Sequence, residues 1–419
     1  ERFKTAGLWA PAAGTLESDP ARRRVSRSLA ELAETVATLS HSLASQSGER
    51  GLSLAHESGA YQRRLRRVRS QMTSLERDCR LALKQSEGLE EQFRRVARKM
   101  SIVQFHLTDS DLIAFVHRRE SVKAVRFPGG RMRLSSALGQ WRFILEGELL
   151  RPHLGNGACV RDEENFFTEL GDWLWRPLEI DTDSQRILVI PEGELANLPW
   201  EALRIDERSL GDSHDIVQSP SLRHFTRARS VKVNSDEINL FVGRADDLPA
   251  VERETKALSQ RAGANGRVYR SCRRSDWPES GEYFIWHYSG HSHLRSDNPF
   301  YSFLALEDAP LFAADFRLRD ARVRLVTLAA CRAAEQVALP GEESTGLVRS
   351  LLEMGARNVI GGRWSVSDDS TALWMNKFYS ALFEGNEISS ARRLANRAVR
   401  SQKPSAYHWA AFAVYGAGD

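Results

Sequence analysis

Hydrophobic positions in the first hundred residues recur at intervals of three and four, which is the spacing of an amphipathic helix. One run ends before the polar stretch SQSGERG and a second run begins after it, so the pattern predicts two helices joined by a turn. The positions are Val25, Leu29, Leu32, Val36, Leu39 and Leu43, followed by Tyr61, Leu65, Val68, Met72, Leu75, Cys79 and Ala82. This seam predicts an N-terminal helical coiled-coil hairpin over residues 1–100, in which Cys79 is a packing residue.

The pattern changes near residue 101, where short apolar runs alternate with polar turns. These runs predict strands, including a buried strand at 187–190, and amphipathic helices are expected near 136–150 and 164–175. Three scattered histidines of this stretch have no obvious partners in the sequence, namely His106, His117 and His153. We expect residues 101–234 to form a scaffold unit without chemistry of its own.

From residue 238 onward, strand patterns and helix patterns alternate. The apolar runs INLFVG, YFIWHYSG, RLVTLAAC and NVIGGRW predict strands, and AVERETKALSQRAG, TGLVRSLLEMG and SDDSTALWMNKFYSALFEG predict helices between them. This alternation predicts an α/β fold over residues 235–419, with a largely parallel sheet flanked by helices. In such sheets, functional side chains gather beyond the carboxyl ends of the strands.

Two of these strand ends carry residues suited to nucleophilic catalysis. The run WHYSGHSH brings His291 directly after a glycine, and the run LAACRAA ends a strand at Cys331. If the two strands are neighbours, an imidazole and a thiol meet at one sheet edge, and the imidazole can make the thiolate available. His287 lies inside the strand and is expected to be packed, while His293 lies beyond the turn. We therefore favour His291 as the partner of Cys331.

Composition excludes several other classes of protein. Hydrophobic residues make up 42% of the 419 residues, which is enough for a sizeable core. The four cysteines are far apart and show no CxxC spacing, which argues against a disulfide framework and a zinc site. No signal segment or membrane-spanning run is present, so we expect a cytoplasmic protein with no membrane partner and no metal or organic cofactor. Because the chain begins with Glu1 and not Met, we expect a trimmed piece of a longer protein.

Positive charge is concentrated in the predicted arm. Residues 1–100 contain 19 Lys and Arg against 12 Asp and Glu, and much of the excess lies in YQRRLRRVR at 61–69. A basic helix of this kind can bind nucleic acid or an acidic protein, although a solvated helix face is the more common explanation. A nucleic-acid partner is therefore expected only indirectly or through this basic arm.

Several blocks of the sequence occur in an order that matches a known family. The blocks IWHYSGHS, VRLVTLAACRAA, STGLVRSLLEMGARNVIGGRWSVSDDSTALWMNKFYSAL and YHWAAFAVYGAG closely resemble the CHAT peptidases, which are caspase-like cysteine proteases. The stretches RILVIPEGELANLPWEAL and QSPSLRHF resemble the upstream part of that family, so the resemblance covers residues 102–419. It implies a caspase-like α/β fold in which an inactive caspase-like unit over 101–234 precedes the active peptidase unit over 235–419.

The resemblance also assigns roles to residues. It implies that His291 is the catalytic histidine, that Cys331 is the nucleophile, and that backbone N–H groups near Gly290, Ser292 and Cys331 bind the oxyanion. The chain departs from the family at Ser292, where glycine is usual, and at Arg332–Ala333, where an acidic residue and threonine are common. Arg332 places a positive charge beside the thiol, which favours a thiolate.

The segment after the next strand supplies candidates for a substrate pocket. They are Arg363, Trp364, Ser365, Asp368 and Asp369, with Glu342 and Glu343 from the preceding loop. An acidic pocket would select a basic residue, whereas Trp364 and its apolar neighbours would suit an uncharged one. Asp368 and Asp369 fit a helix cap with acidic first-turn residues equally well, so the residue at the cleavage site stays open.

Two functions from different classes are compatible with these features. The resemblance implies a cysteine endopeptidase that cleaves a specific protein substrate through an acyl-enzyme. By the same resemblance, an activating protein or an upstream sensor controls it in bacterial defence or cell death, where a gasdermin or a regulator is cleaved. The alternative is a catalytically silent caspase-like adaptor that acts through its coiled-coil arm. The intact His and Cys pair favours the enzyme.

Overall fold

The computed structural model describes residues 94–119, 121–150, 158–180, 185–338 and 344–419. Nearly all of the predicted helical hairpin falls outside these ranges, so the coiled coil and the placement of Cys79 remain predictions. His153, Glu342 and Glu343 also lie outside the described residues.

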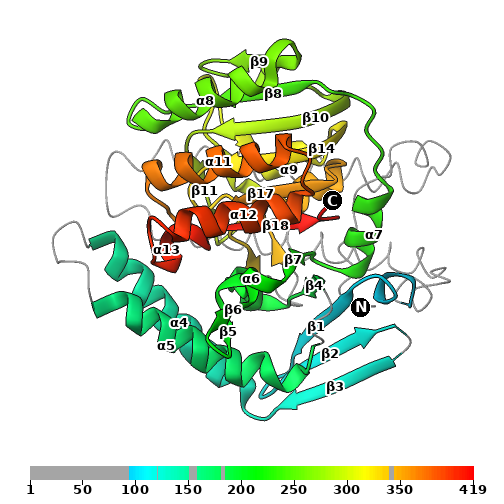
Figure 1. The fold of residues 1–419 in the computed structure, drawn as a ribbon. Helices are drawn as coiled ribbons and strands as arrows, with labels where there is room; N and C mark the ends of the chain where they lie inside the picture. The colour runs from blue at the N-terminus through cyan, green and yellow to red at the C-terminus, as the bar shows by residue number, and fades with distance from the viewer. Residues whose placement is uncertain (1–93, 120, 151–157, 181–184, 339–343) are drawn as a thin grey trace, which may run out of the picture. The chain divides into compact units, whose positions relative to one another are not determined.

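Within the described residues, eleven strands form one mixed sheet (Figure 1). Their order is β3-β2-β1-β4-β7-β18-β17-β14-β10-β8-β9. The strands are β1 (Ser101–Leu107), β2 (Leu112–Arg118), β3 (Ser121–Phe127), β4 (Arg186–Ile190), β7 (Asp215–Gln218), β8 (Ile238–Val242), β9 (Gly266–Tyr269), β10 (Ser280–Ser289), β14 (Asp320–Ala329), β17 (Asn358–Gly362) and β18 (Phe412–Gly416). Neighbours are antiparallel in the pairs β3–β2, β2–β1 and β18–β17, and parallel in the others, as the alternation of patterns predicts.

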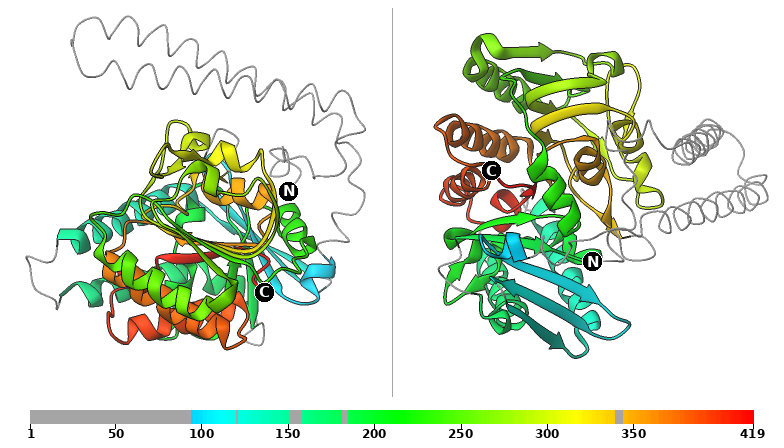
Figure 2. Two further views of the ribbon diagram at one scale, coloured as in Figure 1. Left: turned by 90° about the horizontal axis from the view of Figure 1, so that it is seen from above. Right: turned by 90° about the vertical axis from the view of Figure 1, so that its right-hand side faces the viewer.

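Helices cover both faces of this sheet (Figure 2). One face packs against α4 (Gly130–Leu150), α5 (Ala158–Leu174), α8 (Pro249–Ala262), α11 (Asp368–Phe383), α12 (Ile388–Arg400) and α13 (Ala406–Trp409). The other face packs against α7 (Leu222–Ser230), α9 (Ala313–Phe316) and α10 (Leu347–Met354). The two helices predicted in the middle of the chain are present, and in the described residues each begins six residues earlier than the apolar pattern indicates.

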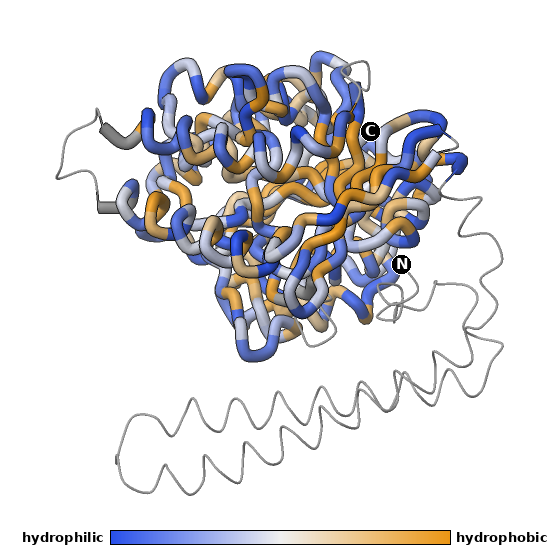
Figure 3. The backbone as a smooth tube through the Cα atoms, turned by 90° about the horizontal axis from the view of Figure 1, so that it is seen from below, coloured by the Kyte–Doolittle hydropathy of each residue, from blue (hydrophilic) through white to orange (hydrophobic). Residues whose placement is uncertain are grey.

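The central strands are apolar on both sides, because both faces of a parallel sheet are covered. In β10, Ile285 belongs to the core beside α8 and α11, whereas Trp286 and Tyr288 belong to the core beside α9 and α10. Figure 3 shows these hydrophobic strands between more polar outer segments. The alternation fixes the register of β10 and β14, because a slip of one residue would exchange the two faces.

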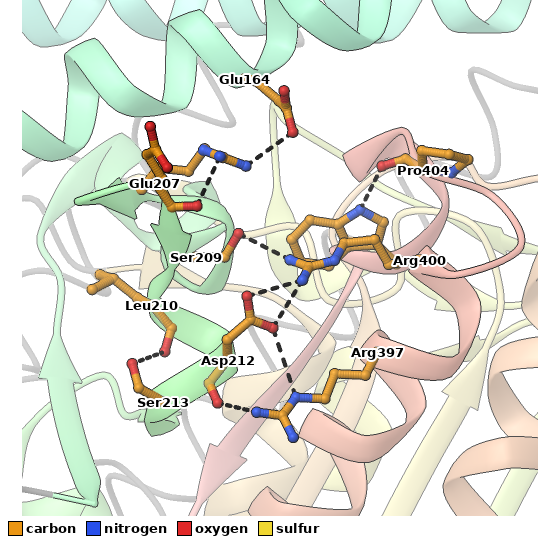
Figure 4. A network of polar contacts seen from close by, with 11 residues as sticks. Glu164, Glu207, Ser209, Leu210, Asp212, Ser213, Arg397, Arg400 and Pro404 are labelled. Atoms are coloured by element: carbon orange, nitrogen blue, oxygen red, sulfur yellow. Dashed lines mark hydrogen bonds and ion pairs between the residues drawn. The ribbon is translucent and has the colours of Figure 1, made fainter.

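The last strand of the chain joins the two predicted units. β18 lies between β7, from the predicted scaffold, and β17, from the predicted peptidase unit. Polar contacts reinforce this junction on α6 (Leu210–Ser213), where the Asp212 carboxylate accepts hydrogen bonds of 2.9 and 3.1 Å from Arg400 of α12 (Figure 4). Arg400 also donates to the Ser209 hydroxyl at 3.1 Å. Residues on either side of position 234 therefore share one sheet.

Two further features bear on function. No helix among the described residues is long and apolar enough to cross a membrane. In the same part of the chain, no three His, Cys, Asp or Glu side chains gather as metal ligands would.

Candidate active site

The strands that lead to His291 and Cys331 are direct neighbours. β10 and β14 pair in parallel up to Ser289 and Ala329, and the partners in every pair differ by 40 in residue number. His291 and Cys331 continue this offset, each two residues beyond the last pair. Because paired strands lie about 4.8 Å apart, the loops carrying the two side chains leave the same edge side by side. The adjacency on which the dyad depends is therefore present.

The turn between β10 and His291 requires a glycine. Gly290 has a φ of +149°, and a Cβ there would lie 2.8 Å from the Tyr288 hydroxyl and 3.2 Å from the carbonyl oxygen of Arg244. The buried Tyr288 hydroxyl donates to the carbonyl oxygen of His291 at 2.7 Å and so stabilises the turn. The Gly290 N–H is directed at the carbonyl oxygen of Ala329 at 3.4 Å. Gly290 thus shapes the loop, and its own N–H continues the strand ladder.

An acidic residue orients the imidazole of His291. Its Nε2 lies 2.7 Å from Oδ1 of Asp247, in the segment between β8 and α8. This hydrogen bond lowers the pKa of Asp247 below its usual range, so the carboxylate is ionised and Nε2 is the donor. The proton on Nε2 leaves Nδ1 as the nitrogen that can accept a proton. Asp247 is not among the residues predicted from the sequence.

Cys331 lies two residues beyond the end of β14, in an exposed position. Its thiol lies 3.7 Å from the carbonyl oxygen of Val366, and its own carbonyl oxygen accepts a 2.5 Å hydrogen bond from the Ser292 hydroxyl. The next residue, Arg332, has a φ of +59°, a left-handed conformation that costs an L-residue about 1–2 kcal/mol. The Arg332 guanidinium pairs with Glu335, so the positive charge predicted beside the thiol is partly balanced.

Cys272, on the segment after β9, is unsuited to catalysis. Cys272 is fully buried, and burial raises the pKa of its thiol to about 12. A thiol in this state stays protonated at neutral pH and is a poor nucleophile. Cys272 therefore provides an internal comparison for Cys331.

His287 is enclosed in the interior, as its position within the strand predicts. Its Nε2 lies 2.8 Å from Oε1 of Glu254, and its Nδ1 lies 2.7 Å from the Thr327 hydroxyl and 2.9 Å from the Tyr379 hydroxyl. The Ser289 hydroxyl donates to the same Glu254 oxygen at 2.6 Å. Both ring nitrogens are thus occupied by side chains from α8, β14 and α11. This network links β10 to β14 four residues before each candidate catalytic residue.

Arg363 and Trp364 point into the fold. The Arg363 guanidinium makes two 3.1 Å hydrogen bonds to the Glu201 carboxylate, and both side chains are at most 2% exposed. The Trp364 indole donates to the carbonyl oxygen of Tyr407 at 3.0 Å and packs edge to face on Trp141. The charge of Arg363 is therefore engaged by Glu201 and is not presented on an open surface.

The remaining pocket candidates lie at the start of α11. Asp368 accepts a 2.6 Å hydrogen bond from the Ala250 N–H in the first turn of α8, and burial raises the pKa of Asp368. Asp369 forms a 2.5 Å ion pair with Arg253 of α8. The Ser367 hydroxyl caps α11, and Ser365 is half-buried. The Ser367 cap and the two acidic residues in the first turn of α11 agree with the helix-cap interpretation. The contacts of Asp368 and Asp369 also join α11 to α8, the helix that follows Asp247.

Residues of the predicted scaffold support the nucleophile loop. The Asn197 amide makes two 2.8 Å hydrogen bonds with the backbone of Gln336, five residues after Cys331. Tyr407, from the C-terminal segment, lies beside the loop as well, and burial raises the pKa of its hydroxyl to about 12. Neither residue carries a sequence motif that would have identified it.

Comparisons with known proteins agree with this geometry. A model of the CHAT domain family matches residues 164–417, more than half of the chain. The fold resembles the separase of Saccharomyces cerevisiae, solved in complex with securin, with a TM-score of 0.56 at 12% identity over 78% of this chain and 31% of the separase chain. A second separase–securin structure gives a TM-score of 0.50 at 14% identity over 78% and 30%. This chain thus spans about a third of the separase chain.

A more distant likeness is to gingipain R of Porphyromonas gingivalis, described as an Arg-specific cysteine proteinase. Its TM-score is 0.40 at 9% identity, over 65% of this chain and 69% of the other. No curated protein sequence matches the chain. The caspase-like α/β fold expected from the sequence is confirmed.

Proposed function

Because the chain belongs to the CHAT domain family, a family of cysteine peptidases, we propose that it is a cysteine endopeptidase with His291 and Cys331 as its catalytic dyad. The observation that carries the proposal is the strand pairing. Paired residues of β10 and β14 differ by 40 in residue number, and His291 and Cys331 differ by the same 40. The hydrogen bond between His291 and Asp247 supports it further, because it leaves Nδ1 as the acceptor nitrogen.

The proposed reaction proceeds through an acyl-enzyme. His291 Nδ1 accepts the proton of the Cys331 thiol, and the thiolate attacks the carbonyl carbon of the scissile amide. Backbone N–H groups of Cys331 and Ser292 stabilise the oxyanion. His291 then gives its proton to the leaving amine as the C–N bond breaks, and a thioester remains on Cys331. Water attacks this thioester while His291 accepts its proton, and the acid product and the thiol are released.

We further propose that a protein partner or an upstream sensor controls this activity on a specific protein substrate. The separase structures contain a second protein, securin, which supports protein control in that fold. We propose that the activity is cytoplasmic and serves bacterial defence or cell death, with a gasdermin or a regulator as the substrate.

Labelling of the thiol tests the dyad without a known substrate. We expect iodoacetamide to modify Cys331 and to spare Cys272, whose thiol is buried and has a pKa of about 12. Replacing His291 by Ala is expected to slow the modification of Cys331 at least about tenfold, because the thiolate loses its proton acceptor. Peptide mapping by mass spectrometry gives both rates. His293→Ala, in the same loop, is the matched control, and equal rates in His291→Ala and wild type would argue against the dyad.

Asp247 is expected to act through His291. Asp247→Asn should lower kcat/KM about tenfold, because the amide no longer favours the imidazole tautomer with its proton on Nε2. The pKa of Asp247 already lies below its usual range, so the carboxylate stays ionised from about pH 5 to about pH 8. The loss should therefore be constant across that window. A loss that disappears towards pH 5 would show that Asp247 titrates there and would contradict this role.

A further inference from the structure

Beyond the end of the β10–β14 ladder, one side-chain hydrogen bond connects the two loops of the candidate site. The Ser292 hydroxyl donates to the carbonyl oxygen of Cys331 at 2.5 Å. We propose that this hydroxyl is a positioning group that fixes the peptide of Cys331, so that the backbone donors of Ser292 and Cys331 keep the spacing the oxyanion requires. The inference rests on the proposed peptidase function and adds to it a role for a side chain.

The peptide unit between Cys331 and Arg332 is held at both ends. Its carbonyl oxygen accepts from Ser292, and its N–H, which belongs to Arg332, is directed at the carbonyl oxygen of Trp364 at 3.3 Å. These two groups point in opposite directions from one rigid plane, so the two contacts fix the orientation of that plane. The orientation matters because Arg332 has a φ of +59°, which a residue with a Cβ keeps only when its surroundings impose it.

The backbone of Ser292 is placed to serve the oxyanion. Ser292 pairs with Leu304 in the small sheet of β11 (Ser292–His293), β12 (Phe303–Leu304) and β13 (Leu311–Phe312). The Ala305 N–H donates to the carbonyl oxygen of His291 at 2.9 Å, which makes His291 and Ala305 the hydrogen-bonded pair. Antiparallel pairs alternate, so Ser292 and Leu304 form a pair without ladder hydrogen bonds, and the Ser292 N–H faces away from β12.

A serine can occupy this position without strain. The strained glycine conformation lies two residues earlier, at Gly290, and Ser292 is absent from the residues with positive φ. A side chain is therefore tolerated at position 292, where the family usually has glycine. The serine adds a hydroxyl that glycine lacks, and this hydroxyl joins the two residues whose N–H groups form the proposed oxyanion site.

Kinetics separate this role from general support of the fold. In Ser292→Ala we expect kcat on acetyl-tetrapeptide coumarin amides to fall about tenfold with KM within about twofold, because the hydrogen bond serves the transition state. Ser292→Thr keeps a hydroxyl and should restore most of kcat. Alkylation of Cys331 by iodoacetamide forms no oxyanion, so its rate should be unchanged in both variants.

Hydrogen exchange provides a readout that does not depend on turnover. Loss of the hydroxyl in Ser292→Ala should make the peptide plane more mobile and speed hydrogen exchange of the Arg332 amide about tenfold, the effect of one hydrogen bond. Ser292→Thr keeps the hydroxyl and should exchange at the wild-type rate. Unchanged exchange, or unchanged kcat in Ser292→Ala, would overturn the inference. A wild-type chain with neither Cys331-dependent cleavage nor His291-dependent labelling of Cys331 would instead reject the proposed function, and the exchange result would still decide whether the hydroxyl positions this peptide.

Discussion

Replacing His291 by Ala is expected to lower kcat/KM about a thousandfold, within the range of 10² to 10⁴ that general acid–base groups contribute. The variant would lose both the acceptor of the thiol proton and the donor to the leaving amine. The fold should survive, since the imidazole is 38% exposed and its one side-chain partner, Asp247, lies on the surface. Steady-state hydrolysis of peptide coumarin amides measures the loss.

His293→Ala is the matched control for this variant. His293 lies two residues away in the same loop, is exposed, and stacks on Phe303 with ring centroids 4.7 Å apart. It should retain kcat/KM within about twofold, as expected of a surface substitution. If His293→Ala were the damaging change and His291→Ala the neutral one, the assignment of the base would be wrong.

Replacing Glu201 by Gln is expected to lower the free energy of unfolding by about 3–5 kcal/mol, the usual cost of removing one partner from a buried ion pair. Glu201 makes two 3.1 Å hydrogen bonds to Arg363 and lies 3.6 Å from Arg392. Burial alone would lower the pKa of Arg363, but the charges and hydrogen bonds of Glu201 and Tyr415 together outweigh burial and raise that pKa. For the pKa of Arg392, by contrast, burial prevails. Arg363 is therefore the main partner, and it would be left buried without a counter-charge.

Urea denaturation measures this loss, and Glu164→Gln is the matched control. Glu164 also pairs with an arginine, Arg204, at 3.0 Å, but its side chain is 52% exposed (Figure 4). Exposed ion pairs contribute about 0–1 kcal/mol, so this variant should unfold close to wild type. Similar losses in the two variants would show that the Glu201 contact contributes no more than a surface pair.

Much of the fold was accessible from the sequence because the central strands carry largely apolar runs in their buried carboxyl-terminal halves. Such runs, separated by helix patterns, predict a parallel sheet, and the carboxyl ends of its strands then collect the candidate residues. The sequence could not establish that β10 and β14 are neighbours, because strand order depends on packing across the whole sheet. The insertion of β18 between β7 and β17 was not visible for the same reason.

The residues that escaped prediction are those whose partners are distant in sequence. Asp247 follows β8, which pairs with β10 on the side away from β14. The rule that led to His291 and Cys331 would have reached Asp247 if the place of β8 had been known. Arg363 was a pocket candidate because it lies directly after the strand that follows the nucleophile. Its partner Glu201 lies 162 positions earlier, and no local pattern indicates that the guanidinium turns inward.

For Asp368 and Asp369, local patterns offered the helix-cap interpretation in advance. A serine before two acidic residues at a helix start is typical of a cap, and the structure supplies the contacts of that interpretation. The choice between cap and pocket could not be made from the sequence, because it depends on α8 and on Arg253 packing against this end of α11.

The most direct test of the account is hydrolysis of a positional library of acetyl-tetrapeptide coumarin amides by the full chain and by Cys331→Ala. We expect cleavage by wild type that is lost in Cys331→Ala and retained in Cys272→Ala, whose cysteine is buried and protonated. The preferred library positions would also define the pocket. Cleavage that persists without Cys331 would contradict the account. A wild-type chain that neither cleaves nor shows His291-dependent labelling of Cys331 would contradict it as well, and would favour the silent adaptor.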